Sequence, residues 1–314
     1  MLNYPLHLKF SPFALSKSSR FVCGGLDWSA RSIHSIHAAF SGADDREALL
    51  RASYDGFVSL GDSWSAAFAA RYLAEEVGSE TEAVPLLEES YERFTALGDR
   101  WNAAFSMYYL SGILLAYGRI AEGIDVAWNA RDIAEEIGDV VWHAHATRNL
   151  GIAARQTGDH EGAREYMKAA LDRLQLMGDD ACTISLNGHL ACVEVALGDT
   201  TAAVRHVTEA MRAASHLGST INSGIALWRV VPVLTAFDDA EQAVRVAVAA
   251  SAPLQGMEDQ LGTALIEEVA AADAAIGETI DPERREQLAA AAEGLSVEDA
   301  IAEVLRWSLA RTRT

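Results

Sequence analysis

The chain has few cysteines, which are common in small secreted proteins, and it lacks the long apolar run of a membrane span. Its three cysteines, Cys23, Cys182 and Cys192, are odd in number and show no C-x-x-C spacing. This argues against a disulfide framework and gives no sign of a zinc site. No apolar run approaches the roughly 18 residues that would span a bilayer. Lys9 and Lys17 interrupt the N-terminal apolar residues, which is unlike a signal peptide. We therefore expect a cytoplasmic protein without a membrane segment.

Lysine is scarce as well, and one sign of charge dominates. Of the 25 basic residues only three are lysines: Lys9, Lys17 and Lys168. Such a bias toward arginine is typical of GC-rich bacterial genomes. Against 45 acidic residues the formal net charge is −20. Residues 1–40 carry +3, which leaves −23 for the rest of the chain. Such a body repels phosphate groups, so we expect no direct binding to nucleic acid or to anionic membranes.

A regular series of turns runs through the middle of the chain. Glycines recur every 20 residues, except that 37 residues rather than 40 separate the first inter-pair turn from the second. A period of this size is typical of a solenoid built from helix pairs. The turn positions are Gly61, Gly78, Gly98, Gly118, Gly138, Gly158, Gly178, Gly198 and Gly218, with Asp238 in the next place.

This spacing predicts an all-α fold, a right-handed α-solenoid of about six antiparallel helix pairs followed by a C-terminal helical cap. We expect a flexible N-terminal tail at 1–25, the repeat array at 26–252 and the cap at 253–314. The cap is expected to cover the apolar end of the array. The predicted pairs are 27–60, 63–96, 99–136, 140–176, 180–216 and 219–252.

The turns also have a chemical basis. Glycine suits the left-handed residue that follows a helix, and an aspartate directly after it can cap the next helix. The dipeptide Gly-Asp occurs at six of these turns. We therefore predict that one dipeptide ends one helix and begins the next at positions 61, 98, 138, 158, 178 and 198.

Small residues recur after the turns that lie within a pair. One follows five positions after the turn and a second follows seven residues later, as at Ala163 and Ala170 after Gly158. Small side chains at this spacing let two helices approach closely. The pattern resembles the tetratricopeptide repeat, and Leu150-Gly151 resembles that family's Leu-Gly pair. The family repeat has about 34 residues, whereas this one has 40.

The longer repeat carries W-x-A-A after two Gly-Asp turns, at Trp64–Ala67 and Trp101–Ala104. In this it resembles the C-terminal repeat arrays of LuxR-type and related ATP-dependent bacterial signalling regulators. The resemblance implies an array that senses an effector or holds a partner. The chain has no G-x-x-x-x-G-K phosphate loop, and no helix-turn-helix follows its last predicted helix. We therefore expect neither ATP hydrolysis nor DNA binding.

The resemblance implies that the first helix of each pair lines the concave face. Ten residues before each turn within a pair lies a column that includes aromatic residues and an arginine, and further members lie nearby on similar faces. Aromatic rings supply contact area, and arginine forms a forked pair with a carboxylate or phosphate. The predicted binding residues are Phe68, Tyr72, Phe105, Tyr108, His145, Arg148, Arg155 and Trp228. A plainer interpretation is that the aromatic residues are core and that the arginines pair with glutamates on neighbouring helices.

No catalytic or metal-binding pattern stands out. His143 and His145 lie on different faces of a helix, and His34 and His37 share a face without a further ligand at useful spacing. Adjacent glutamates diverge by about 100° around a helix, which suits a solvated surface better than a catalytic pair. We predict no metal and no cofactor.

The sequence thus favours a non-enzymatic helical-repeat protein in bacterial signalling or transcriptional regulation. Its expected partner is a protein or peptide segment, with a small-molecule effector as an alternative ligand. Two other functions stay open: a helical-repeat enzyme with an unrecognised site, and an assembly scaffold that forms homo-oligomers through its array ends.

Overall fold

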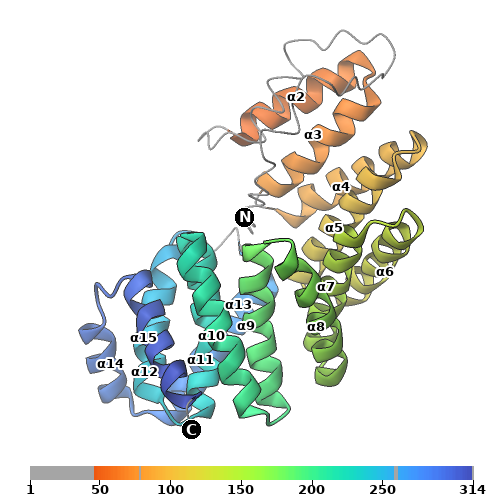
Figure 1. The fold of residues 1–314 in the computed structure, drawn as a ribbon. Helices are drawn as coiled ribbons and strands as arrows, with labels where there is room; N and C mark the ends of the chain where they lie inside the picture. The colour runs from red at the N-terminus through yellow and green to blue at the C-terminus, as the bar shows by residue number, and fades with distance from the viewer. Residues whose placement is uncertain (1–45, 78, 258–260, 313–314) are drawn as a thin grey trace.

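The computed structural model describes residues 46–77, 79–257 and 261–312. The expected tail at 1–25 and the first helix of the first predicted pair lie outside these ranges. Every regular element in the described ranges is helical, and helices that follow one another in the chain pack together. Figure 1 shows the helices stacked in chain order from α2 to α12, with the last three returning against the later repeats. The all-α solenoid predicted from the turn spacing is confirmed.

The helix boundaries follow the 20-residue period closely. After α2 come five complete pairs, each a first helix followed by a second helix, and then the C-terminal helices. The helices are α2 (Arg46–Leu60), α3 (Ser63–Glu76), α4 (Glu80–Ala96), α5 (Arg100–Ala116), α6 (Ile120–Glu136), α7 (Val140–Gln156), α8 (His160–Leu176), α9 (Asp180–Ala196), α10 (Thr200–Leu217), α11 (Thr220–Ala236), α12 (Ala240–Ser251) with the 3₁₀ turn η2 (Ala252–Leu254), α13 (Thr263–Thr279), α14 (Pro282–Ala291) and α15 (Val297–Arg311).

The Gly-Asp turns work as predicted. At the end of α4, Gly98 has a φ of 73°, and the amide of Asp99 donates to the carbonyl of Phe94. This is the hydrogen-bond pattern of a Schellman motif. The carboxylate of Asp99 then accepts from the amide of Asn102 and caps α5. Two residues therefore satisfy backbone groups of both helices. The same side-chain cap forms at Asp62, Asp139, Asp159, Asp179 and Asp199.

The array curves with its first helices inside. Along α5, α7, α9 and α11, the first helices of successive pairs pack directly against one another, whereas the second helices of successive pairs make hardly any contact. Closer spacing on one side bends a stack toward that side, so the first helices form the concave face. This agrees with the position that the family resemblance implied for them.

The C-terminal helices pack against the last repeats on two sides. Helix α15 packs against α10 and α12, which are second helices, and α14 packs against α12. Helix α13 instead packs against α11 and α12 and reaches α5 at its start. The sequence did not predict that this segment would enter the concave face. No helix in the described part of the chain has both the length and the apolar character to cross a bilayer.

Candidate functional site

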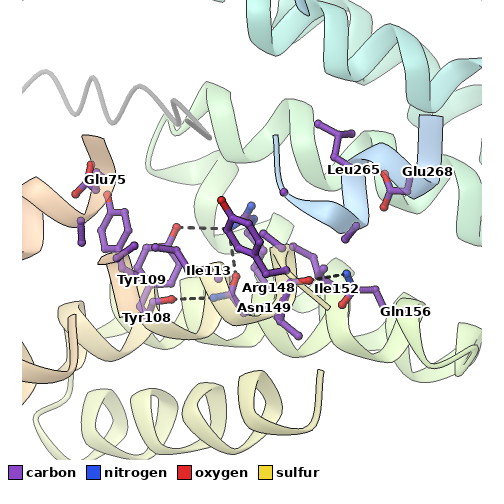
Figure 2. Close-up of a pocket in the computed structure, with 18 of the residues that line it drawn as sticks. Glu75, Tyr108, Tyr109, Ile113, Arg148, Asn149, Ile152, Gln156, Leu265 and Glu268 are labelled. Atoms are coloured by element: carbon purple, nitrogen blue, oxygen red, sulfur yellow. Dashed lines mark hydrogen bonds between the residues drawn. The ribbon is translucent and has the colours of Figure 1, made fainter. Parts of the chain in front are cut away.

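A cavity of about 120 Å³ opens on the concave face. Most of its wall comes from five first helices and from the start of α13, and the beginning of α4 adds a small part. Figure 2 shows Tyr108, Arg148 and Asn149 in the middle of this wall, with Glu75 and Tyr109 on one side and Leu265 and Glu268 on the other. The cavity lining includes Glu75, Tyr108, Tyr109, Arg148, Asn149, Ile152, Gln156, His189, Arg229, Gly262, Leu265 and Glu268.

Four of these residues occupy one position in four successive repeats. Tyr109, Asn149, His189 and Arg229 are spaced by 40 residues, and all four line the cavity. They lie one position after the column from which the binding residues were predicted. The repeat geometry therefore brings a phenol, an amide, an imidazole and a guanidinium to one opening.

Arg148 and Asn149 tie α7 to α5. One guanidinium nitrogen of Arg148 donates to the Tyr108 hydroxyl at 3.4 Å and to the Asn149 side-chain oxygen at 3.3 Å. The Asn149 amide donates to the Tyr108 carbonyl at 3.0 Å and to the Ser111 hydroxyl at 2.6 Å. Burying a guanidinium and an amide is costly unless they are hydrogen-bonded. These contacts fix the middle of the cavity wall.

Glu75 of α3 brings a carboxyl group to the cavity. Burial raises the pKa of Glu75 to about 7, although Arg71 and Arg46 act to lower it. The Tyr109 side chain lies next to Glu75 (Figure 2). Burial also raises the pKa of the Tyr109 phenol well above its usual value. Glu75 Oε1 and the Tyr109 hydroxyl are both covered, and neither makes a hydrogen bond of ordinary geometry within the described residues. The Tyr109 hydroxyl nevertheless lies near enough to the Glu75 carboxyl group to act against the rise of its pKa, so the two groups form a loosely paired polar patch in the cavity wall.

Arginines surround His189 of α9. Burial lowers the pKa of His189 well below its usual value, and Arg229, Arg155 and Arg148 act in the same direction. The imidazole is therefore neutral at neutral pH. Glu268 of α13 forms an ion pair with Arg155, and its other carboxylate oxygen lies 3.5 Å from Arg229.

The predicted binding residues do not all reach the cavity. Tyr108 and Arg148 line it, and Arg155 lies at its edge through Glu268. Phe105 stacks on Trp142 with ring centroids 4.0 Å apart, and His145 lies against the same tryptophan. The last three residues, in α3 and α11, are half-buried or buried among neighbouring side chains: Phe68, Tyr72 and Trp228, with Phe68 stacked on Trp64.

Three groups that could hold a metal ion meet between α7 and α9. His145 Nδ1 lies 3.8 Å from the sulfur of Cys182, and His145 Nε2 lies 3.7 Å from Asp179. One ligand atom from each residue lies within 4.8 Å of the other two, although the two shortest contacts use different ring nitrogens and one ion would bind only one of them. Burial lowers the pKa of His145 and raises the pKa of the Cys182 thiol, and the nearby positive charge of Arg148 acts to lower both. That charge opposes a bound cation.

Several residues of the site were not predicted from the sequence. Tyr109, His189 and Arg229 follow the same 40-residue spacing as the predicted column, so the spacing would have found them with an offset of one. Glu268 gives no such signal, because α13 lies outside the repeat. Its place in the cavity depends on the path of the chain after the last pair.

Comparison with known proteins supports the repeat class. Residues 142–216, which span α7 to α10, match a family model described as tetratricopeptide repeat. No curated protein matches the chain. Tetratricopeptide repeats generally mediate contacts between proteins. The array described above therefore contains tetratricopeptide-like repeats, as the turn spacing and small residues predicted.

Proposed function

We propose that this chain is a non-enzymatic binding module that holds a protein or peptide segment on its concave face. The observation that carries this proposal is the column of Tyr109, Asn149, His189 and Arg229, which directs four side chains from four successive repeats to one cavity. Side chains that converge from a rigid scaffold are typical of binding sites. The repeat class points in the same direction.

The size of the cavity limits what enters it. An apolar cavity of ~150 Å³ can hold a benzene molecule, and this one measures about 120 Å³. It would therefore admit one side chain of a bound segment rather than a whole peptide. The rest of the segment would lie along the concave face. A small effector of similar size is the alternative ligand.

The biological setting of this proposal comes from the sequence. The long repeat and its W-x-A-A motif resemble the arrays of LuxR-type and related regulators. We therefore place the chain in bacterial signalling or transcriptional regulation in the cytoplasm.

A peptide selection tests the proposed function. The full chain would be used to select binders from a phage-displayed library of short random peptides, and each selected peptide would then be titrated by fluorescence anisotropy. Ile152→Trp fills the cavity from α7 and should weaken binding at least about tenfold, or ~1.4 kcal/mol. Gln156→Ala, a milder change in the same wall, should weaken binding less.

The matched control is Leu176→Trp, because Leu176 is 90% exposed at the end of α8. It adds the same indole away from the cavity and should leave affinity unchanged. Circular dichroism would confirm that each variant is folded. Selected peptides that bind wild type, Ile152→Trp and Gln156→Ala equally would contradict the proposed site.

One observation favours a second function, a helical-repeat enzyme. Glu75 and His189 line the same cavity with shifted pKa values, and such residues often mark active sites. A carboxyl group with a pKa of about 7 suits general acid–base catalysis at neutral pH. Turnover of any substrate in a panel of esters, amides and glycosides that is lost in Glu75→Gln would support this alternative. Turnover that is equal in wild type and Glu75→Gln would count against it.

A further inference from the structure

A segment from beyond the repeats crosses the concave face. We call residues 261–279, which comprise Leu261, Gly262 and α13, the strap. Gly262 lies so close to α5 that a Cβ at this position would be 2.6 Å from the Ala116 carbonyl oxygen. The segment therefore reaches from the last repeat to a helix three repeats earlier. Only glycine permits that approach without displacing the backbone.

The start of the strap fills part of the site with two kinds of side chain. Leu265 is buried and lines the cavity. Glu268, one helical turn later, pairs with Arg155 of α7 and approaches Arg229 of α11. An apolar residue and a carboxylate three positions apart lie on one face of a helix. The strap thus places a short amphipathic, acidic helix against the concave face.

Few buried side chains hold the strap against the repeats. Across α13 only Leu265, Ala272 and Ile276 are buried, and Ile266 is 45% exposed. All three belong to the large core shared with α11 and α12, and the N-terminal part of α13 is held in addition by the ion pair of Glu268 and the approach at Gly262. Segments with few buried apolar contacts open at low free-energy cost. To leave the cavity, the N-terminal part of α13 gives up one buried leucine and one ion pair, while Ala272 and Ile276 can stay in place.

We infer that the strap is a built-in competitor for the partner. This inference depends on the proposed function, and it names the partner as an acidic amphipathic helix. Such a helix carries an apolar residue followed three positions later by a glutamate or aspartate. Its apolar residue takes the place of Leu265 in the cavity, and its carboxylate takes the place of Glu268 between Arg155 and Arg229. Helices that bind in grooves commonly use anchors at this spacing.

The charges at this place favour an acidic partner, although the chain as a whole is acidic. The net charge of −20 repels acidic segments from the surface as a whole. Arg155 and Arg229 come from two different first helices and already hold one carboxylate. Arginine forks recognise carboxylates through paired, charge-assisted hydrogen bonds. The two arginines therefore set both the position and the sign of the partner's charge.

The test uses the strap's own sequence as the probe. A fluorescein-labelled peptide of residues 261–280 is titrated against the full chain by anisotropy. In the Glu268→Gln chain the internal carboxylate is neutral, so the strap competes less well. We expect this chain to bind the peptide at least about tenfold more tightly than wild type. A peptide that carries Glu268→Gln should lose this binding.

Two further chains identify the site and protect the result against misfolding. Adding Arg155→Ala to the Glu268→Gln chain should return the affinity to the wild-type value or below. The matched control adds Arg212→Ala instead, because Arg212 pairs with Glu209 on the outer helix α10. This control should bind the peptide as tightly as Glu268→Gln alone. Hydrogen exchange should show faster exchange at residues 261–268 in Glu268→Gln and unchanged exchange in α3 and α4.

Equal affinity of the wild-type and Glu268→Gln chains for the peptide would overturn the inference, as would binding that is insensitive to Arg155→Ala. Slower or unchanged exchange at 261–268 in Glu268→Gln would do the same. If the strap peptide fails while peptides selected by phage display still bind at Ile152, the strap inference falls and the binding function stands. If both kinds of peptide fail to bind at the cavity, both proposals are wrong.

Discussion

The first and second halves of the array are built from the same repeat but organise their cores differently. From α2 to α9 the buried apolar residues form several separate clusters, in which adjoining repeats pack together. From α10 onward one large cluster joins the last repeats with α13, α14 and α15, and it takes in part of α9. The concave face differs in the same way, because α3, α5 and α7 line much of the cavity while α13 packs on α11. Repeats stabilise their neighbours, and the C-terminal helices add a tie between distant parts of the chain.

This difference bears on where the molecule can respond to a ligand. In the first half, each repeat depends on the next, so a ligand in the cavity acts on a local stack. In the second half, the strap links the cavity to the C-terminal core. A partner that displaces the start of α13 would therefore also change the packing of helices that it does not contact. The four predictions below test this contrast.

The largest effect is expected for Trp307→Ala in α15. The Trp307 indole donates to Asp239 at 2.9 Å and packs edge-on against Phe237. Replacing a buried aromatic residue by alanine leaves a cavity and costs about 3–5 kcal/mol. Hydrogen exchange should accelerate in α11 to α15 and change little in α3 to α7. The counterpart in the first half, Trp142→Ala, should show the reverse pattern. Loss of protection across the whole chain in both variants would mean that the two halves unfold as one unit.

The next effect concerns Glu75 and the pH. The folded state holds the pKa of Glu75 at about 7, above its ordinary value of 4.5. Between these values the folded protein keeps a proton that the unfolded chain has released. The free energy of unfolding therefore falls as the pH rises through this window. We expect a total decrease of about 2 kcal/mol, because solvent reduces the effect of the pKa shift at a side chain that is only half-buried. Denaturant unfolding should show this slope in wild type and a flatter profile in Glu75→Gln.

The Glu75→Gln chain should accordingly be the more stable of the two above pH 7, and the difference should vanish below pH 4.5. Exchange in α3 and α5 should report the change, whereas α14 and α15 should not. A slope of equal size in Glu75→Gln would assign the effect to another group.

A smaller effect is expected for Gly262→Ala, which tests the tie between the halves. The added methyl group would clash with the Ala116 carbonyl, so the start of the strap has to move. Overpacking of this kind costs about 1–3 kcal/mol. Exchange at residues 261–268 should increase. Gly277→Ala is the control, because a methyl group there meets its nearest neighbour at 3.6 Å. Unchanged exchange in Gly262→Ala would show that the strap adapts without leaving α5.

The smallest effect is a gain in stability from Asp238→Gly. Asp238 occupies a turn where other repeats have glycine, and its φ is 56°. Left-handed backbone is strained for residues with a side chain, so glycine should stabilise the turn by about 0.5–1 kcal/mol. Thermal unfolding would measure the gain. Because this turn lies in the second half, exchange should slow in α11 and α12 first. A loss of stability would mean that the Asp238 side chain contributes more than its backbone costs.

Much of the fold could be predicted because its signals are local. A glycine that must adopt positive φ and an aspartate that caps the following helix mark six of the helix boundaries within two residues, as at Gly98-Asp99. The candidate site was harder to predict, and Phe105 and Trp228 show why. The first helices are buried on several sides, so an apolar or aromatic residue does not reveal which side is concave. Each residue turns the direction by about 100°, and the cavity therefore collects Tyr109 and Asn149 beside Tyr108 and Arg148.

The repeat length, the helix boundaries and the all-helical class follow from the order of residues, because turns and caps depend on neighbours a few positions apart. The course of the strap and the pairing of Glu268 with Arg155 and Arg229 do not. These contacts join residues more than a hundred positions apart for Arg155, and they arise only once the curvature of the stacked repeats has brought α5, α7 and α11 around a common opening. Curvature is the sum of small rotations between packed helices, and no single position in the chain records it.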